Sequence, residues 1–227
     1  MERLERLTRD LETPYAVVDG AALAHNTAEL VRRAGGVPVR VASKSLRVRE
    51  ILDRTLAHDG YAGVMSYSLA ESIWLADEGH TDLLLAYPSV HRAGLRDLVA
   101  KEHRPAAITL MVDSLAHLDL IDAVVGTDRP PIRVCIDVDS SLEPFRRVHL
   151  GARRSPVHSP GDAIALARAI AHRKLILKGV QAYGGHWQHL MRLVGVRHSI
   201  ILPGGRATTG TPRCQPLADD DHSSAQV

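Results

Sequence analysis

The sequence predicts an α/β fold in which parallel strands alternate with helices. The apolar residues switch repeatedly between short β-prone runs and longer stretches with helical spacing. The chain has 227 residues, 45% of them hydrophobic, which is enough for one sizeable core. Its first strand-to-helix turn, Asp19-Gly20-Ala21, carries neither a GxGxxG motif nor a Walker A motif. That disfavours an open nucleotide-binding sheet. Of the two compatible architectures, an open doubly wound sheet and a (β/α)8 TIM-type barrel, we therefore expect the barrel.

The first two predicted units lie before residue 58. A β-prone run predicts a strand at Tyr15–Val18, and helical spacing predicts a helix over Ala21–Arg33. Gly35-Gly36 is a helix-ending signal. The next strand is predicted at Val39–Ser43, followed by a helix over Val48–Ala57 with one apolar face.

The third unit has the clearest helix start. We predict a strand at Ala62–Met65 and a helix over Leu69–Asp77. Ser68 is a candidate N-cap, and Glu71 follows at the spacing of a capping box. The fourth predicted strand is Asp82–Tyr87.

The same alternation continues to residue 182 and then stops. The remaining predicted elements are a helix over Leu95–Lys101, a strand at Ala107–Val112, a helix over Leu115–Val125, a strand at Ile132–Val138, a helix over Asp162–His172 after Ser159-Pro160, and a strand at Leu175–Ala182. This gives seven strands and six helices, so an eighth unit is not recognisable. We expect a barrel domain over residues 1–188, incomplete at its C-terminus, and a divergent, largely irregular tail over residues 189–227.

Composition excludes several classes of function. The 28 Lys+Arg residues nearly balance the 26 Asp+Glu residues, and aromatic residues make up 4%, so we expect no nucleic-acid surface. The two cysteines have no CxxC partner, and the histidines show no HExxH spacing, so we expect no metal site. No apolar run approaches the roughly 20 residues of a membrane span. The charged start of the chain lacks a signal-peptide pattern, so a cytoplasmic location is expected.

Lys44 is the strongest candidate for chemistry. It follows an apolar strand in the string Val39–Ser45, at the carboxyl end where barrels collect their active sites. A partly desolvated lysine there can lose its proton and react with an aldehyde cofactor. Taken by itself, however, a lysine at the end of a strand is more often a solvated end-cap.

The wider pattern around Lys44 resembles a known family. Its blocks are Thr13–Asp19 (TPYAVVD), Asn26 on the following helix, Val41–Lys44, Gly63–Ser68, Asp82–Pro88, Ile136–Asp139, Gly151–Pro156 and Gly179–His186 (GVQAYGGH). In order and spacing they resemble the alanine racemase N-terminal-type (fold type III) enzymes that use pyridoxal 5'-phosphate (PLP). The resemblance points to the D-threonine aldolase/D-serine dehydratase-like branch, including the bacterial amino acid deaminase/aldolases, and covers roughly residues 12 to 188.

The resemblance implies roles for individual residues. Lys44 would form the Schiff base with PLP, and Tyr183 would lie near the cofactor and the substrate, although a tyrosine at a strand end can also simply pack on a loop. His186 lies in the same turn as Tyr183, where an exposed loop histidine is the competing interpretation. Where the family often has R-x-G, this chain has His149-Leu150-Gly151. Either His149 substitutes for that arginine, or Arg153 or Arg147 approaches the cofactor, or the arginines of this loop are a solvated cluster (Arg146, Arg147, Arg153 and Arg154).

The resemblance also implies an activity. A PLP-dependent lyase of the aldolase/deaminase type, or a racemase, would act on a small-molecule D-amino acid, and the family suggests a homodimer. The β-domain with which such enzymes continue, and which supplies metal ligands in the aldolase/dehydratase branch, is not recognisable here, so we expect a truncated chain that could be inactive. The alternative is a non-catalytic, single-domain PLP-binding homeostasis protein.

Overall fold

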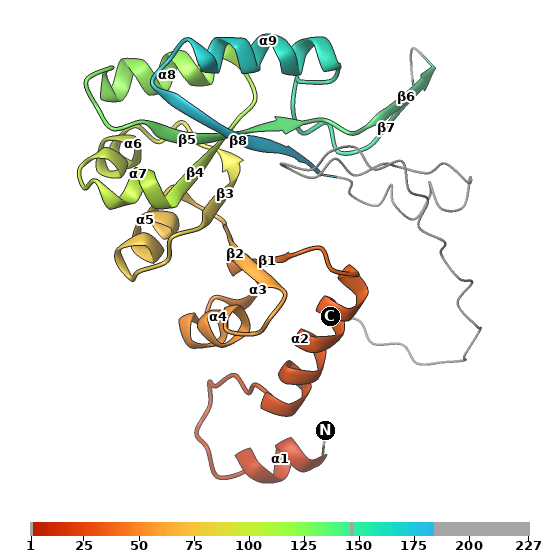
Figure 1. Ribbon diagram of the computed structural model, residues 1–227. Coiled ribbons are helices and arrows are strands. Elements are labelled where there is room, and N and C mark those ends of the chain that lie inside the picture. Colours follow the sequence, from red (N-terminus) through yellow and green to blue (C-terminus); the bar gives the residue numbers. More distant parts are fainter. Residues whose placement is uncertain (1, 146–147, 184–227) are drawn as a thin grey trace.

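A computed structural model describes residues 2–145 and 148–183 of the chain. Its centre is a six-stranded sheet in which every neighbouring pair is parallel, in the order β1-β2-β3-β4-β5-β8 (Figure 1). The strands are β1 (Val39–Ala42), β2 (Tyr61–Ser66), β3 (Leu83–Pro88), β4 (Ile108–Val112), β5 (Ile132–Val138) and β8 (Leu175–Ala182). The predicted α/β class is confirmed. Within the described residues β1 and β8 remain the two edges, so the sheet is an incomplete barrel.

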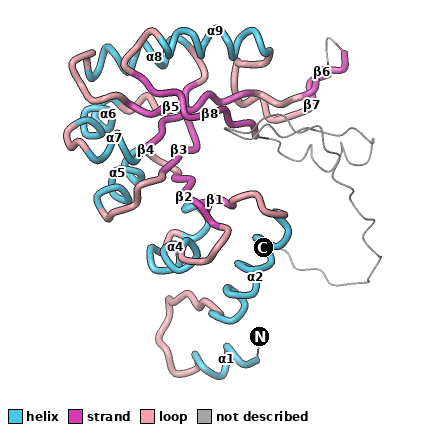
Figure 2. The backbone as a smooth tube through the Cα atoms, viewed as in Figure 1, coloured by secondary structure: helices cyan, strands magenta, loops and turns pink. Residues whose placement is uncertain are grey.

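Helices connect successive strands and pack mainly against one face of the sheet (Figure 2). They are α1 (Glu2–Thr8), α2 (Gly20–Ala34), α3 (Ser43–Leu46), α4 (Arg49–Leu56), α5 (Leu69–Asp77), α6 (Arg92–Val99), α7 (His103–Ala107), α8 (Leu115–Val125) and α9 (Pro160–Ala171). The core lies between this layer and the sheet, and branched aliphatic side chains fill it. Members with at most 1% exposure include Val64, Leu75, Leu83, Leu85, Leu95, Leu98, Ile108, Leu118, Ile132, Val134 and Ile170. Removing their apolar surface from water is the main stabilising contribution.

The helix signals in the sequence act as predicted. Ser68 caps α5 by accepting from the Glu71 N–H at 3.2 Å, while the Glu71 carboxylate accepts from the Tyr67 N–H at 2.7 Å. Gly35 ends α2 with a left-handed φ of 60°. Ser159 and Asp162 form a reciprocal capping box at the start of α9. The Ser68 and Ser159 caps fix the loops that enter α5 and α9, whereas the Gly35 cap ends α2 ahead of β1.

Some predicted details are wrong. Tyr15–Val18 is not a strand: the segment has no ladder partner among the described residues, and Tyr15, Val17 and Val18 are exposed by 43–54%. β-propensity without a neighbouring strand leaves backbone groups unpaired, so the segment stays irregular. Hydrophobic periodicity did not predict α1, α3, α7 or the antiparallel pair β6 (Leu142–Phe145) and β7 (Val148–Leu150).

Neither a membrane-spanning helix nor a metal-binding cluster is found in the described part of the chain. None of the helices found there is long and apolar enough to cross a bilayer. Among those same residues, no cluster of three or more His, Cys, Asp or Glu side chains is placed to hold a metal ion. The predicted tail over residues 189–227 lies outside the described residues.

Candidate functional site

The candidate site is built where the parallel strands end. Lys44 follows β1, Tyr67 follows β2, Tyr87 lies at the end of β3, and Tyr183 follows β8. Because all these strands are parallel, their carboxyl ends meet at one edge of the sheet. A residue from the loop after β7, Arg154, completes the group.

Lys44 lies in the first turn after β1. The preceding residue, Ser43, is 4% exposed, and its hydroxyl donates to the Met65 carbonyl of β2 at 3.3 Å. This bond ties the start of α3 to the neighbouring strand. The Lys44 side chain is exposed, and its Nζ lies 5.7 Å from the centroid of the Tyr67 ring. The Arg47 guanidinium lies at the same distance from that ring, so two cations approach one aromatic ring.

Tyr67 and Tyr87 form an aromatic wall between two groups of cations. Their ring centroids are 5.6 Å apart at an interplanar angle of 81°, an edge-to-face contact. Tyr87 in turn lies 4.5 Å from the Arg154 guanidinium, which is also 5.2 Å from the ring of Tyr183. The Tyr183 carbonyl accepts from the Ser140 hydroxyl at 3.1 Å. The site therefore runs without a break from Lys44 at β1 to Tyr183 at β8.

Asp137 of β5 holds the Arg154 side chain in place. Arg154 Nε donates to Asp137 Oδ2 at 3.1 Å, and its Nη2 donates to the Ala86 carbonyl of β3. The Asp137 side chain is fully buried and that of Arg154 is 17% exposed. Burial raises the pKa of the Asp137 carboxyl, Arg154 opposes that shift, and the nearby carboxylates of Asp113 and Asp139 add to it.

A small recess adjoins the aromatic wall. It has a volume of about 260 Å³ and lies between the ends of β2 and β3 and the starts of α5 and α6. Tyr67 and Tyr87 line it together with Leu69, Leu85, Pro88 and His91. The tyrosine pair thus belongs both to the recess and to the cationic cluster.

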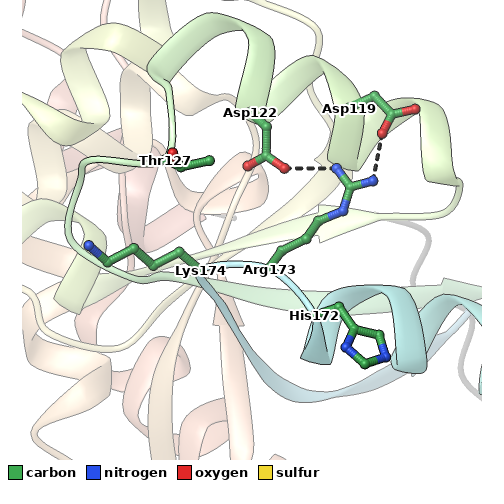
Figure 3. A pocket seen from close by; sticks show the side chains of 6 residues that line it. All are labelled: Asp119, Asp122, Thr127, His172, Arg173 and Lys174. Atoms are coloured by element: carbon green, nitrogen blue, oxygen red, sulfur yellow. Dashed lines mark hydrogen bonds and ion pairs between the residues drawn. The ribbon is translucent and has the colours of Figure 1, made fainter.

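A larger recess, of about 620 Å³, lies at the opposite edge of the sheet (Figure 3). Its charges largely neutralise one another, since Arg173 pairs with Asp119 at 2.6 Å and with Asp122 at 2.8 Å. These pairs join α8 to the turn before β8. In barrel folds the amino-terminal edge serves stability and the carboxyl-terminal edge carries chemistry, so we assign the site to the Lys44 edge despite the smaller recess there.

The residues expected from the sequence are only partly brought together. Lys44 and Tyr183 both lie in the cluster. Arg153 is exposed, has a left-handed φ of 43°, and makes no contact with the cluster among the described residues. Among the arginines of this loop that the structure describes, Arg154 approaches the site and is only 17% exposed, whereas Arg146 and Arg147 lie outside the described residues. His149 lies on β7, with its side chain outside the described part, and His186 lies wholly outside it.

Sequence reasoning missed Tyr67, Tyr87 and Asp137 as site residues. The two tyrosines could have been found, because each stands at the carboxyl end of a predicted strand, as Lys44 does. Asp137 also carried a signal, as the one carboxylate within the apolar strand Ile132–Val138. A lone acid in a buried strand needs a partner.

Chemically, the cluster offers an amine, two guanidinium groups and three phenol rings around one edge of the sheet. Such a set suits a planar aromatic ligand that carries anionic groups: the cations complement the negative charge, and the rings provide flat apolar contacts. A lysine amine such as that of Lys44 can attack a carbonyl carbon once it is deprotonated.

Comparisons with known proteins show which sequences and folds this chain is similar to. The family model described as alanine racemase, N-terminal domain, matches residues 18–191. D-threonine aldolase from Filomicrobium marinum is similar at 25% identity and a TM-score of 0.65, over 80% of this chain and 47% of that one. A metal-free C353A mutant of D-threo-3-hydroxyaspartate dehydratase gives 25% identity and a TM-score of 0.63, over 82% and 49%. Alanine racemase from E. faecalis shares the fold, at 14% identity and a TM-score of 0.55, over 81% and 50%.

The matched solved structures are longer than this chain, which spans about half of their length. No curated protein matches the chain.

Proposed function

We propose that this chain, which belongs to the alanine racemase N-terminal domain family, binds PLP through Lys44 and takes part in lyase chemistry on a D-amino acid. The observation that carries the proposal is the Lys44 amine at the carboxyl edge of the sheet, 5.7 Å from the Tyr67 ring. The similar D-threonine aldolase and D-threo-3-hydroxyaspartate dehydratase support the choice of a D-amino acid and of a lyase over a racemase.

The residues present fit the cofactor. PLP combines an aldehyde, a planar pyridine ring and anionic oxygens, and the site offers an amine, aromatic rings and guanidinium groups. Arg154 has one nitrogen, Nη1, without a protein acceptor among the described residues, so it can donate to an anionic oxygen of the ligand. Lys44 would hold the cofactor, Arg154 would face one of its oxygens, and Tyr183 would contact its ring.

Each side chain then has a defined task. When bound, PLP supplies an electron sink for a bond broken at the substrate Cα. Lys44 Nζ is the atom that would hold the cofactor, and the same amine would accept a proton from the substrate. Tyr67 and Tyr87 wall off one side of the site, and Arg154 fixes the orientation of the anionic ligand. The cytoplasm is the compartment we propose for this chemistry, and a homodimer is the assembly we propose.

Covalent capture of PLP tests this proposal. The protein is incubated with PLP and reduced with borohydride, and the modified residue is located by peptide mass mapping. We expect one major adduct, on Lys44, and its loss in Lys44→Ala. Lys178→Ala is a control, because Lys178 is exposed on β8 before the strand's carboxyl end. Scattered adducts, or none, would refute the assignment of Lys44.

Turnover is tested separately. A holo-protein that cleaves or dehydrates D-threonine or D-3-hydroxyaspartate, and loses this activity in Lys44→Ala, supports the lyase. A protein with a Lys44 adduct that converts neither these substrates nor other D-amino acids refutes the lyase and favours a PLP-binding role.

A further inference from the structure

Arg154 depends on tertiary contacts for its position, because it lies in the irregular loop between β7 and α9. Two contacts from β5 hold this loop. The Ser155 hydroxyl donates to the Asp137 backbone carbonyl at 2.7 Å, and the Asp137 carboxylate accepts from Arg154 Nε at 3.1 Å. The first contact fixes the backbone of the loop. The second acts on the guanidinium itself.

We propose that Asp137 is a positioning residue that acts through Arg154: its carboxylate holds the guanidinium between the rings of Tyr87 and Tyr183 and leaves Nη1 free for an anionic ligand. The inference rests on the proposed function for the identity of that ligand, but not for the orientation of Arg154. Asp137 would not touch the ligand itself and would act on it only through Arg154.

The hydrogen bonding of Asp137 argues against a purely stabilising role. Asp137 Oδ1 and Gln181 Oε1 are both buried without a hydrogen-bond partner in the described part of the chain. These two residues are register partners on β5 and β8. Unpaired buried acceptors cost stability, so the unpaired Oδ1 makes Asp137 costly to bury and calls for a role beyond stabilisation. Within the described residues, the hydrogen bond that the Asp137 carboxylate does make is the one from Arg154 Nε.

The surroundings of Arg154 show what the carboxylate achieves. The guanidinium is bonded along one edge by Asp137 Oδ2 and the Ala86 carbonyl, and rings lie on it at 4.5 and 5.2 Å. The hydrogen bonds at Nε and Nη2 and the contacts with the two rings together remove most of its rotational freedom. An arginine fixed before the ligand arrives loses less entropy on binding.

The test compares Asp137→Asn with a matched loop variant, Ser155→Ala. The asparagine keeps the shape and removes the charge, whereas Ser155→Ala loosens the backbone of the same loop and leaves the guanidinium's own bonds in place. Two quantities are measured on the full chain: the NMR signal of the Arg154 Nε–H, assigned by its loss in Arg154→Lys, and the dissociation constant for PLP.

We expect the Arg154 Nε–H signal to be displaced from the bulk of the arginine signals in the wild type and in Ser155→Ala, and to return to the bulk in Asp137→Asn. PLP should bind about tenfold more weakly to Asp137→Asn, at the low end of what outer-shell partners contribute at metal sites, and within about twofold of wild type to Ser155→Ala. If Asp137→Asn does not fold, Asp137→Glu replaces it; because this variant keeps the charge but moves it by one methylene, the Nε–H signal should shift from its wild-type position and PLP should bind more weakly.

The proposal is overturned if the Nε–H signal is unchanged in Asp137→Asn, or if both variants weaken PLP binding equally. A wild-type chain that captures no PLP would instead refute the proposed function, and the Nε–H signal would still decide whether Asp137 positions Arg154.

Discussion

Arg40 and Asp82 form an ion pair that crosses an intervening strand. Arg40 Nη2 lies 2.9 Å from Asp82 Oδ2, and Arg40 Nη1 donates to the Asp82 carbonyl at 3.2 Å. β2 runs between them, and at the crossing point it carries Gly63, with a φ of 70°. A Cβ on Gly63 would meet Arg40 Nη1 at 2.2 Å and Asp82 Oδ2 at 2.3 Å. The glycine is therefore needed for the pair to form.

We predict that Gly63→Ala destabilises the protein by about 2–3 kcal/mol, from the strained backbone together with the crowding of the pair. Gly79→Ala is the control, because Gly79 also has a positive φ, of 99°, but nothing lies within 4 Å of its added Cβ. That variant should lose only about 1 kcal/mol. Urea unfolding followed by circular dichroism measures both, and equal losses would show that the ion pair accommodates a Cβ.

The two adjacent arginines of the β7–α9 loop should behave differently. Arg154→Ala removes the partner of a buried carboxylate and the free Nη1, so we predict about 2 kcal/mol lower stability and PLP binding at least tenfold weaker. Arg153→Ala removes an exposed side chain and should change stability by no more than about 0.5 kcal/mol. Absorbance titration with PLP, corrected for the folded fraction, separates them. The reverse ranking would give the cofactor contact to Arg153.

These two arginines illustrate what sequence can and cannot determine. Lys44 could be predicted as a candidate because two sequence features coincide there: an apolar strand ends just before it, and the blocks around it match a known family in order and spacing. Which of Arg153 and Arg154 faces the site depends on a left-handed φ at Arg153 and on Asp137, 17 residues away. The hydrophobic periodicity of the sequence carries no information about such a long-range contact. The strand predicted at Tyr15–Val18 failed for a related reason, since propensity does not specify a pairing partner.

The α5–α7 junction should make the protein sensitive to acid. Arg104, 7% exposed, pairs with Asp77 at 2.7 Å and holds the pKa of that carboxyl below its usual range, helped by His103 and Lys101 and opposed by partial burial. Because the folded-state pKa is lowered, the stabilisation is present above the unfolded pKa of about 3.9 and is lost as pH falls through the folded value.

We therefore predict that the wild type loses stability below about pH 4 more steeply than Asp77→Asn does, as measured by urea unfolding at a series of pH values. Asp59→Asn is the control, since the Asp59 side chain is exposed and makes no ion pair within the described residues. Parallel curves for the wild type and Asp77→Asn would mean that the Arg104 pair does not shift the titration.

The thiol of Cys135 should report unfolding of the central strands. Cys135 lies on β5 and is 6% exposed, and burial, followed by the charge of Asp137, raises its pKa to about 12. Since the thiolate is the reactive form, both access and ionisation suppress alkylation in the folded state. We predict that iodoacetamide at pH 8 modifies Cys135 at least 100-fold more slowly in native protein than in urea. At this pH, a rise in the thiol pKa to about 12 lowers the thiolate fraction by more than 100-fold on its own. Peptide mass mapping over time measures the rate for this residue by itself. Rapid labelling without denaturant would mean that β5, which carries Asp137, opens readily in solution, and Arg154 would then lack a fixed anchor.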